Sequence, residues 1–243
     1  MITKGELFLI PTTISENTSD KVIPLQVKNE LKSIRFFLVE EVRTARRYLS
    51  SLKVVEAIEN LVFEVLDKNT TEESLKKMFE PLFNGNNVGI LSESGCPGVA
   101  DPGSLAVKYA HQHGIKVRPL VGPSSILLAL MGSGLNGQCF SFHGYLPIEK
   151  QSISKAIKSL EKESSQKNQT QIFIETPYRN NSIIRHLITN LRDDTFLCRA
   201  IDLTGADEDI KTLPVKTWRT IKEELPKLPA IFLFLAEKTG NKN

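Results

Sequence analysis

The sequence predicts an α/β fold, and the stretch 88–133 supplies the main observations. An apolar run at 88–91 is followed by a loop rich in Gly, Pro and Ser, and then by an amphipathic segment that ends at Gly114. A second apolar run at 116–121 leads into another Gly-Pro-Ser loop and a further helix to about Ser133. Strand, loop, helix, strand, loop and helix in this order predict a crossover unit of a parallel sheet.

The length and composition are those of a globular protein. With 243 residues, 40% hydrophobic and 24% charged, the chain can hold two modest domains or one large one. It has no apolar run of membrane-spanning length and no signal-peptide pattern, so we expect a cytoplasmic protein without a membrane partner. The net charge of +3 neither supports nor excludes an RNA substrate.

The cysteines and histidines do not have the spacing of a metal site. Cys96, Cys139 and Cys198 are far apart and odd in number, which favours reduced structural thiols. His111 and His113 are two residues apart and would point to different faces of a helix. We therefore expect no metal.

The remaining elements follow from apolar runs and helix-start signals. In the first half we expect strands at 6–10 and 36–39, a charged helix start at Glu40-Glu41, and a helix over 71–83. Asp101 and Pro102 fit a capped start of the helix that ends at Gly114. The Asn136-Gly137 turn is where we expect a first domain to end.

A second series of elements begins at Phe140. Expected strands cover 140–142, 171–174, 195–203 and 229–235, and expected helices cover 153–160, a stretch after Glu175 with an apolar stripe from Ile183 to Leu191, and 218–225. We expect residues 161–170 to form a solvated polar loop.

Both loops of the 88–133 stretch permit close approach of a ligand to the main chain. Gly95, Gly98, Gly103 and Gly122 have no Cβ, and several serines offer small hydroxyl groups. One such loop is usually an ordinary turn, but two at the carboxyl edge of one sheet favour a ligand pocket. Neither phosphate-binding glycine motif occurs in the chain.

These loops also carry a resemblance. LSESGCPGVADPG followed by VRPLVGPSS resembles the paired signatures of the tetrapyrrole methylase superfamily, and the Asp101-Pro102-Gly103 ending is similar to its ribosomal RNA small-subunit methyltransferase I branch. The resemblance implies S-adenosylmethionine (SAM) bound in a cleft between two α/β domains, here 1–137 and 138–243. It also implies methylation of a ribose 2′-hydroxyl in ribosomal RNA of the small subunit, and a homodimer.

The resemblance assigns roles to individual residues. It places Glu40, Arg43 and Asp101 at the methyl-transfer site, and Arg43, Tyr145 and Arg179 on the substrate. The cofactor contacts that it implies are Pro11, Ser94, Gly95, Cys96, Val99, Ser124, Ser125, Glu175, Leu203 and Ala230. Glu40, Asp101 and Glu175 all remain candidates for the general base, and each also has a structural interpretation as an acid near a helix start.

Departures from the family pattern keep other functions open. The loop Thr12–Asn17 lacks the family's Gly, the basic residue expected after Thr204 is missing, and the acidic stretch Asp207–Asp209 would repel phosphate. A SAM-dependent methyltransferase of a tetrapyrrole or another small molecule is therefore the alternative. A SAM-binding protein without activity is a third hypothesis, which the retained cofactor loops disfavour.

Overall fold

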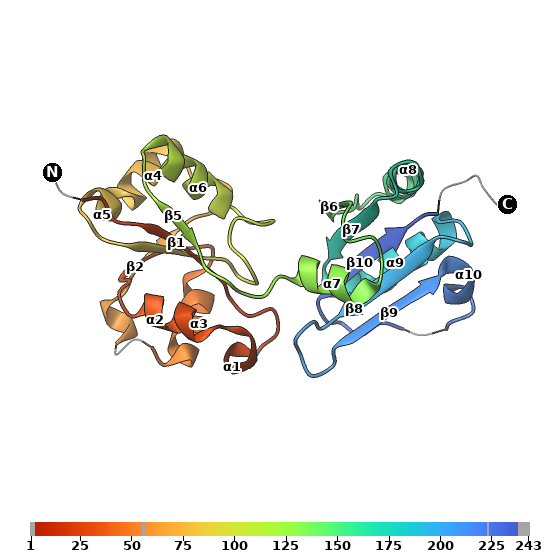
Figure 1. Cartoon of the computed structure of the whole chain (residues 1–243), viewed down its shortest axis with the longest axis horizontal. Helices are drawn as coiled ribbons and strands as arrows, with labels where there is room; N and C mark the ends of the chain where they lie inside the picture. The colour runs from red at the N-terminus through yellow and green to blue at the C-terminus, as the bar shows by residue number, and fades with distance from the viewer. Residues whose placement is uncertain (1–2, 55–56, 223, 238–243) are drawn as a thin grey trace. The chain divides into compact units, whose positions relative to one another are not determined.

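The computed structural model describes residues 3–54, 57–222 and 224–237 (Figure 1). The chain divides into two compact units, residues 1–124 and 125–243. Within the described residues, each unit has its own five-stranded sheet. The expected two-domain α/β fold is therefore confirmed. No helix among these residues combines the length and the apolar character that a membrane crossing needs.

The first unit contains a parallel sheet. Its strands lie in the order β3-β2-β4-β1-β5, and every neighbouring pair is parallel. The bounds are β1 Leu7–Ile10, β2 Phe36–Val39, β3 Val62–Val65, β4 Val88–Leu91 and β5 Val117–Pro119. Because β4 and β5 are separated by β1 in the sheet, helix α6 (Gly103–Gln112) crosses over β1.

Alternation along β1 divides the side chains of the first unit between two cores. Phe8 and Ile10 pack on one face with α1 (Ser19–Val22), α2 (Leu25–Leu31) and α3 (Val42–Leu52). Leu7 packs on the other face with α4 (Glu72–Met78), α5 (Glu80–Phe83) and α6. Figure 1 shows α4 and α6 on one side of this sheet and α2 and α3 on the other.

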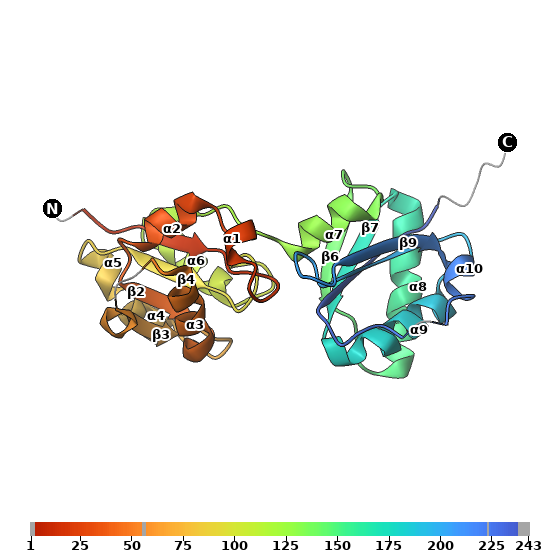
Figure 2. The same cartoon turned by 90° about the horizontal axis from the view of Figure 1, so that it is seen from below.

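The second unit contains a mixed sheet in the order β6-β7-β10-β8-β9 (Figure 1). Figure 2 shows β6, β7 and β9 of this sheet from below. Only β6 and β7 pair in parallel; the other neighbours are antiparallel. The bounds are β6 Phe140–Tyr145, β7 Thr170–Glu175, β8 Phe196–Ile201, β9 Asp209–Pro214 and β10 Ala230–Leu235. One face is covered by α8 (Lys150–Lys167), α9 (Asn180–Asn190) and α10 (Val215–Trp218).

Helix α7 (Ser125–Ser133) covers the other face of this second sheet. Its buried residues Ala129 and Leu130 pack with Ile172, Cys198 and Leu233. The boundary between the units therefore lies at Ser124–Ser125, earlier than the expected boundary at Gly137. The sequence places α7 directly after a strand of the first sheet, but its apolar face is buried against the second.

Several expected elements differ from those observed. The helix expected over 71–83 is two helices, α4 and α5, with Pro81 in the first turn of the second. The helix expected over 218–225 is instead α10, which begins at Val215 and ends at Trp218, and residue 223 lies outside the described residues. Strands β3 and β9 were not expected. Val62 and Val65 are exposed and every residue of β9 is only half-buried, so neither strand needs the buried apolar pattern from which a strand is predicted.

The expectation of a polar loop at 161–170 is wrong, because helix α8 continues to Lys167. Glu161, Ser164 and Ser165 occupy buried positions that continue the stripe of Ile153 and Ile157. Because these buried positions are polar, the helical periodicity of apolar residues is not visible in this part of the sequence. The polar residues are tolerated there because each forms hydrogen bonds within the core.

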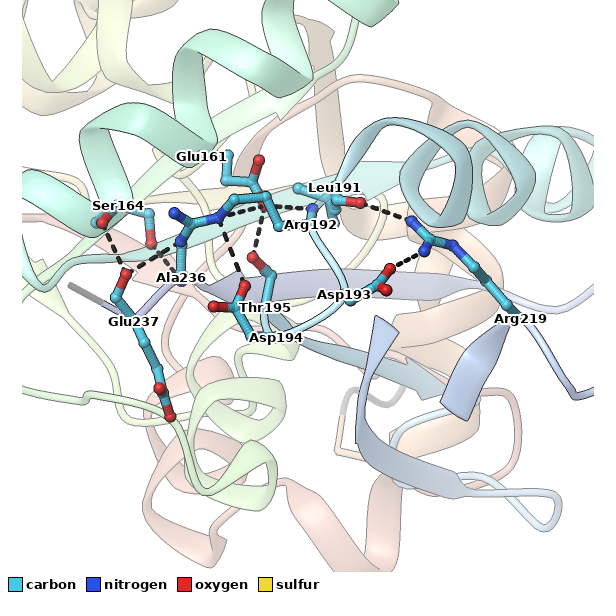
Figure 3. A network of polar contacts seen from close by, with 11 residues as sticks. Glu161, Ser164, Leu191, Arg192, Asp193, Asp194, Thr195, Arg219, Ala236 and Glu237 are labelled. Atoms are coloured by element: carbon cyan, nitrogen blue, oxygen red, sulfur yellow. Dashed lines mark hydrogen bonds and ion pairs between the residues drawn. The ribbon is translucent and has the colours of Figure 1, made fainter. Parts of the chain in front are cut away.

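Glu161 is the centre of this buried polar network (Figure 3). Its Oε1 accepts from the Thr195 hydroxyl at 2.5 Å and from the Arg192 backbone N–H at 2.8 Å. Ser164 Oγ accepts from the Ala236 N–H at 2.9 Å. These bonds connect α8 to the residues that precede β8 and follow β10.

We predict that Glu161→Ala lowers the free energy of unfolding by about 2–3 kcal/mol, because it leaves the buried Thr195 hydroxyl and Arg192 N–H without their acceptor. Urea denaturation measures the change. The matched control is Glu163→Ala on the same helix, whose exposed pair with Lys167 contributes below about 1 kcal/mol. Equal losses in the two variants would contradict a structural role for the buried carboxylate.

Candidate functional site

The carboxyl ends of the parallel strands bring four segments together at one edge of the first sheet. Ile10 of β1 and Val39 of β2 both lie opposite Leu91 of β4, and Leu9 lies opposite Pro119 of β5. The residues that follow these strands must therefore emerge side by side. They include the expected site residues Pro11, Glu40, Ser94–Asp101 and Ser124.

Direct contacts join three of these segments. Thr12 N–H donates to the Gly95 carbonyl at 2.8 Å, and the Tyr48 hydroxyl donates to the Pro11 carbonyl at 2.7 Å. The Cys96 thiol lies 3.3 Å from the Pro123 carbonyl oxygen. The two Gly-Pro-Ser loops and the loop after β1 therefore form one assembled cluster, as expected from their positions at strand ends.

Glycine is required at one point of this cluster and favoured at another. A Cβ on Gly122 would lie 2.1 Å from Cβ of Pro11, so no other residue fits without displacing the β1 loop. Gly95 has φ of +73°, and a Cβ there would lie 3.4 Å from the Pro123 carbonyl oxygen. Pro11, Gly95 and Cys96, expected from separate motifs, are thus brought together by backbone contact.

Thr12 is a member of the cluster that motif comparison did not single out. It is 5% exposed, and its Oγ1 has no hydrogen-bond partner in the part of the chain that the structure describes. A buried hydroxyl without a partner is costly, so a polar atom of a ligand would satisfy it. This orphan hydroxyl and the small residues around it fit a cofactor that lies against the main chain.

An acidic pocket of about 930 Å³ lies beside the cluster. It is lined by the expected catalytic residues Glu40 and Asp101, but not by Ser94–Cys96. Its other charged residues are Glu41, Asp67, Lys68 and Glu93. Over the described ranges, no group of three or more His, Cys, Asp or Glu side chains has the arrangement of a metal site.

Two carboxyl groups of the pocket have a raised pKa. Burial raises the pKa of Glu40 above its usual value, and the negative charge of Asp101 adds to the effect. Burial also raises the pKa of Asp101, although the N–H groups of Gly98 and Gly103 donate to its Oδ1 at 2.6 and 2.8 Å. Both carboxylates are therefore better proton acceptors than exposed ones.

Neighbouring charges in the segment after β2 have different roles. Glu41 is the N-cap of α3, and its carboxylate accepts from the N–H groups of Arg43 and Thr44. The helix-start interpretation therefore describes Glu41, which both caps α3 and lines the pocket, whereas Glu40 lines the pocket without being the cap. The Arg43 side chain is exposed, which leaves it accessible to a ligand.

The second unit gathers the other expected site residues at one edge of its sheet. Ala230 of β10 lies opposite Glu175 of β7 and Ile201 of β8, and Tyr145 of β6 lies opposite Ile174. Leu203 follows β8 at the same edge. Because β10 runs antiparallel to β7 and β8, its first residue meets their carboxyl ends.

Arg179 and Glu175 form a partly buried ion pair. Arg179 Nη2 lies 3.2 Å from Glu175 Oε2, and the Glu175 side chain is 0% exposed while that of Arg179 is 27% exposed. Glu175 Oε1 accepts from the Thr176 N–H at 2.8 Å. The buried carboxylate therefore has a charged partner, and Arg179 is less accessible to phosphate than Arg43.

The acidic stretch after β8 is largely engaged within its own loop. The Glu208 carboxylate accepts from the Thr204 N–H at 2.6 Å, and Asp209 pairs with the buried Arg199 at 2.7 Å. The Asp207 N–H donates to the Asp202 carboxylate. Two of the three acidic side chains expected to repel phosphate thus support the turn that follows Leu203.

Comparison with known proteins gives consistent matches over most of the chain. The family described as Tetrapyrrole (Corrin/Porphyrin) Methylases matches residues 23–217. A Vibrio cholerae protein named ribosomal RNA small subunit methyltransferase I is 30% identical over 215 residues, which cover 87% of this chain and 70% of the relative. Proteins of the same name from Bacillus subtilis and Thermotoga maritima are 33% and 29% identical, covering 72% and 80% of this chain and 56% and 82% of their own lengths.

Two solved structures share the fold at low identity. The methyltransferase CobJ superposes with a TM-score of 0.59 at 14% identity, covering 98% of this chain and 96% of its own. The uroporphyrin-III-C-methyltransferase from Thermus thermophilus superposes with a TM-score of 0.51 at 16% identity, covering 95% and 92%. At these identities the likeness concerns the fold alone.

We predict that Asp101→Asn gains stability relative to wild type as the pH rises. Asparagine keeps the Oδ1 acceptor for both glycine N–H groups and removes the charge. Because the folded-state pKa of Asp101 is raised, its favourable contribution is present below the ordinary aspartate pKa and is lost as pH rises through the raised value. Urea denaturation at pH 3, 4, 5.5 and 7 measures the trend.

The control variant is Asp67→Asn in the same pocket. Hydrogen bonds, first from the Asn69 N–H, lower the pKa of Asp67, so this contribution is lost as the pH falls. The two variants should therefore diverge from wild type in opposite directions. Parallel curves would contradict the assignment of Asp101.

Proposed function

Because the chain belongs to the tetrapyrrole methylase family, within its ribosomal RNA small-subunit methyltransferase I type, we propose that it is a SAM-dependent methyltransferase of ribosomal RNA. The proposed acceptor is a ribose 2′-hydroxyl in the RNA of the small subunit. The observation that carries the cofactor assignment is the loop cluster at the carboxyl edge of the first sheet, with its closely packed Gly122, the positive φ of Gly95 and the orphan Thr12 hydroxyl.

The proposed cofactor residues come from both units. Pro11, Ser94, Gly95, Cys96, Val99 and Ser124 belong to the first, and Ser125, Glu175, Leu203 and Ala230 to the second. The cofactor supplies a methyl group on a sulfonium, whose departure leaves a neutral thioether. The chain therefore has to align the acceptor, exclude water and remove the hydroxyl proton, and it needs no group to stabilise a leaving anion.

Glu40 and Asp101 are the better candidates for the proton acceptor. Both line the acidic pocket, and both have a raised pKa, which increases the affinity of the carboxylate for the hydroxyl proton. Glu175 is a weaker candidate, because its buried carboxylate is already engaged by Arg179 and by the Thr176 N–H. This contact favours a supporting role for Glu175 on the cofactor side.

The proposed RNA contacts are Arg43, Tyr145 and Arg179. Arg43 and Tyr145 are exposed, and Arg179 is held by Glu175 and by the Pro147 carbonyl. Arg43 is therefore the better probe of phosphate binding, because truncating Arg179 would also leave a buried carboxylate without its partner. We also propose that the protein is a homodimer, because the family that it resembles dimerises, and that it acts in the cytoplasm, because ribosomal RNA is located there.

A small-molecule acceptor is the alternative, and the acidic pocket favours it. Five carboxylate residues and one lysine line the pocket, a composition that suits an uncharged or cationic acceptor better than a polyanion. The alternative predicts methyl transfer to a small acceptor in the absence of RNA.

Labelled SAM provides the test of the proposed function. We expect label in small-subunit ribosomal RNA or small subunits, and, after nuclease digestion, in a 2′-O-methylated nucleoside. Arg43→Ala should raise the KM for RNA several-fold and lower the salt dependence of RNA binding by about one unit of slope, because one phosphate contact is lost. Transfer to a small acceptor but to no RNA would favour the alternative.

Gly95→Leu tests the cofactor site separately. The new side chain occupies the backbone approach beside Pro123, so calorimetry should detect no SAM binding. The matched control is Gly114→Leu, which also has a positive φ, of +60°, but has open space around it at the end of α6. Both variants carry the left-handed backbone strain of about 1–2 kcal/mol, so only the difference in SAM affinity reports the site.

A further inference from the structure

Three large exposed side chains lie at the edge of the second sheet that carries Glu175 and Ala230. Tyr145, Ile148 and Tyr178 are 58%, 83% and 82% exposed. Tyr145 ends β6, Ile148 follows it, and Tyr178 lies in the 3₁₀ turn Pro177–Arg179 after β7. Exposed aromatic rings are common in recognition surfaces, because they offer a large contact area with little conformational entropy to lose.

The two segments that carry these side chains are in contact. β6 and β7 pair in parallel up to Tyr145 opposite Ile174, so their following loops leave the sheet together. Arg179 Nη2 donates to the Pro147 carbonyl at 3.5 Å. Tyr178 is thus the neighbour of a residue that binds both the β6 loop and the buried Glu175.

A cation is positioned against the Tyr178 ring from a third segment. Lys227 Nζ lies 5.7 Å from the ring centroid, and Lys227 precedes β10. Asn180 fixes the main chain on both sides of this lysine, because its buried Nδ2 donates to the carbonyls of Pro226 at 3.2 Å and Leu228 at 2.8 Å. The pairing of ring and ammonium is therefore supported by a buried anchor.

We propose that Tyr178 and Lys227 form a stacking platform for an unpaired base of the RNA substrate, with the Lys227 ammonium also contacting the adjacent phosphate. The proposal rests on the proposed function. Single-stranded RNA is bound by stacking bases on exposed aromatic rings and by pairing phosphates with nearby cations. The platform lies at the edge of the second sheet that carries the proposed cofactor residues Glu175 and Ala230.

Fluorescence anisotropy with a labelled single-stranded fragment of small-subunit ribosomal RNA tests the platform. Tyr178→Ala should weaken RNA binding and raise the KM for RNA about tenfold, while kcat and the Kd for SAM stay near wild type. Tyr178→Phe keeps the ring and should retain wild-type affinity. Lys227→Ala should weaken binding and lower its salt dependence. The control is Lys162→Ala, which removes an exposed lysine on α8 and should change neither the RNA affinity nor its salt dependence.

The outcomes separate this proposal from the proposed function. If wild type methylates RNA and Tyr178→Ala binds RNA as tightly as wild type, the platform is overturned and the function stands. If Tyr178→Ala instead raises the Kd for SAM, the ring contacts the cofactor adenine and the RNA assignment is overturned. If wild type methylates no RNA, the proposed function fails, and unchanged anisotropy in Tyr178→Ala would then overturn the platform independently.

Discussion

The contact of Gly122 with Pro11 is the constraint on which the arrangement of the first sheet's edge depends. At this point the loops after β1 and β5 are so close that a Cβ on Gly122 would overlap with Pro11. The contact keeps Thr12 within hydrogen-bond reach of Gly95, and Cys96 beside Pro123. A cofactor that lies against main-chain atoms needs this rigidity, because its position is defined by the backbone rather than by long side chains.

The sequence predicted what depends on local pattern. Val88–Leu91 and Phe36–Val39 are continuous apolar runs, and the structure has strands with those bounds. The glycines and prolines between Ser92 and Gly103 predicted a loop at the end of a strand, because glycine has no Cβ and proline cannot continue regular hydrogen bonding. Pro11, Gly95 and Gly122 lie close together because each follows a parallel strand, and the loops after parallel strands lie at the same edge of a sheet.

What sequence could not supply depends on partners far along the chain. Glu161 belongs to a buried helix face only because Thr195 and Arg192 satisfy it. Helix α7 is apolar, but nothing in its residues says which sheet it covers. Likewise, Arg179 and Glu208 read as exposed charges in the sequence, whereas the structure engages them with Glu175 and Thr204. A charge motif therefore indicates a ligand only after its internal partners are known.

The strand order of the second sheet has a consequence for how this half of the chain reaches its native state during synthesis. Among the described residues, β10 is the last strand in sequence, but it lies between β7 and β8. Until it emerges, β6-β7 and β8-β9 are two separate pairs with their inner edges unpaired, and such edges are prone to association. All five strands of the first unit precede Ser124, so that sheet can close much earlier. Completion of the second sheet therefore waits for the final apolar segment, 230–235.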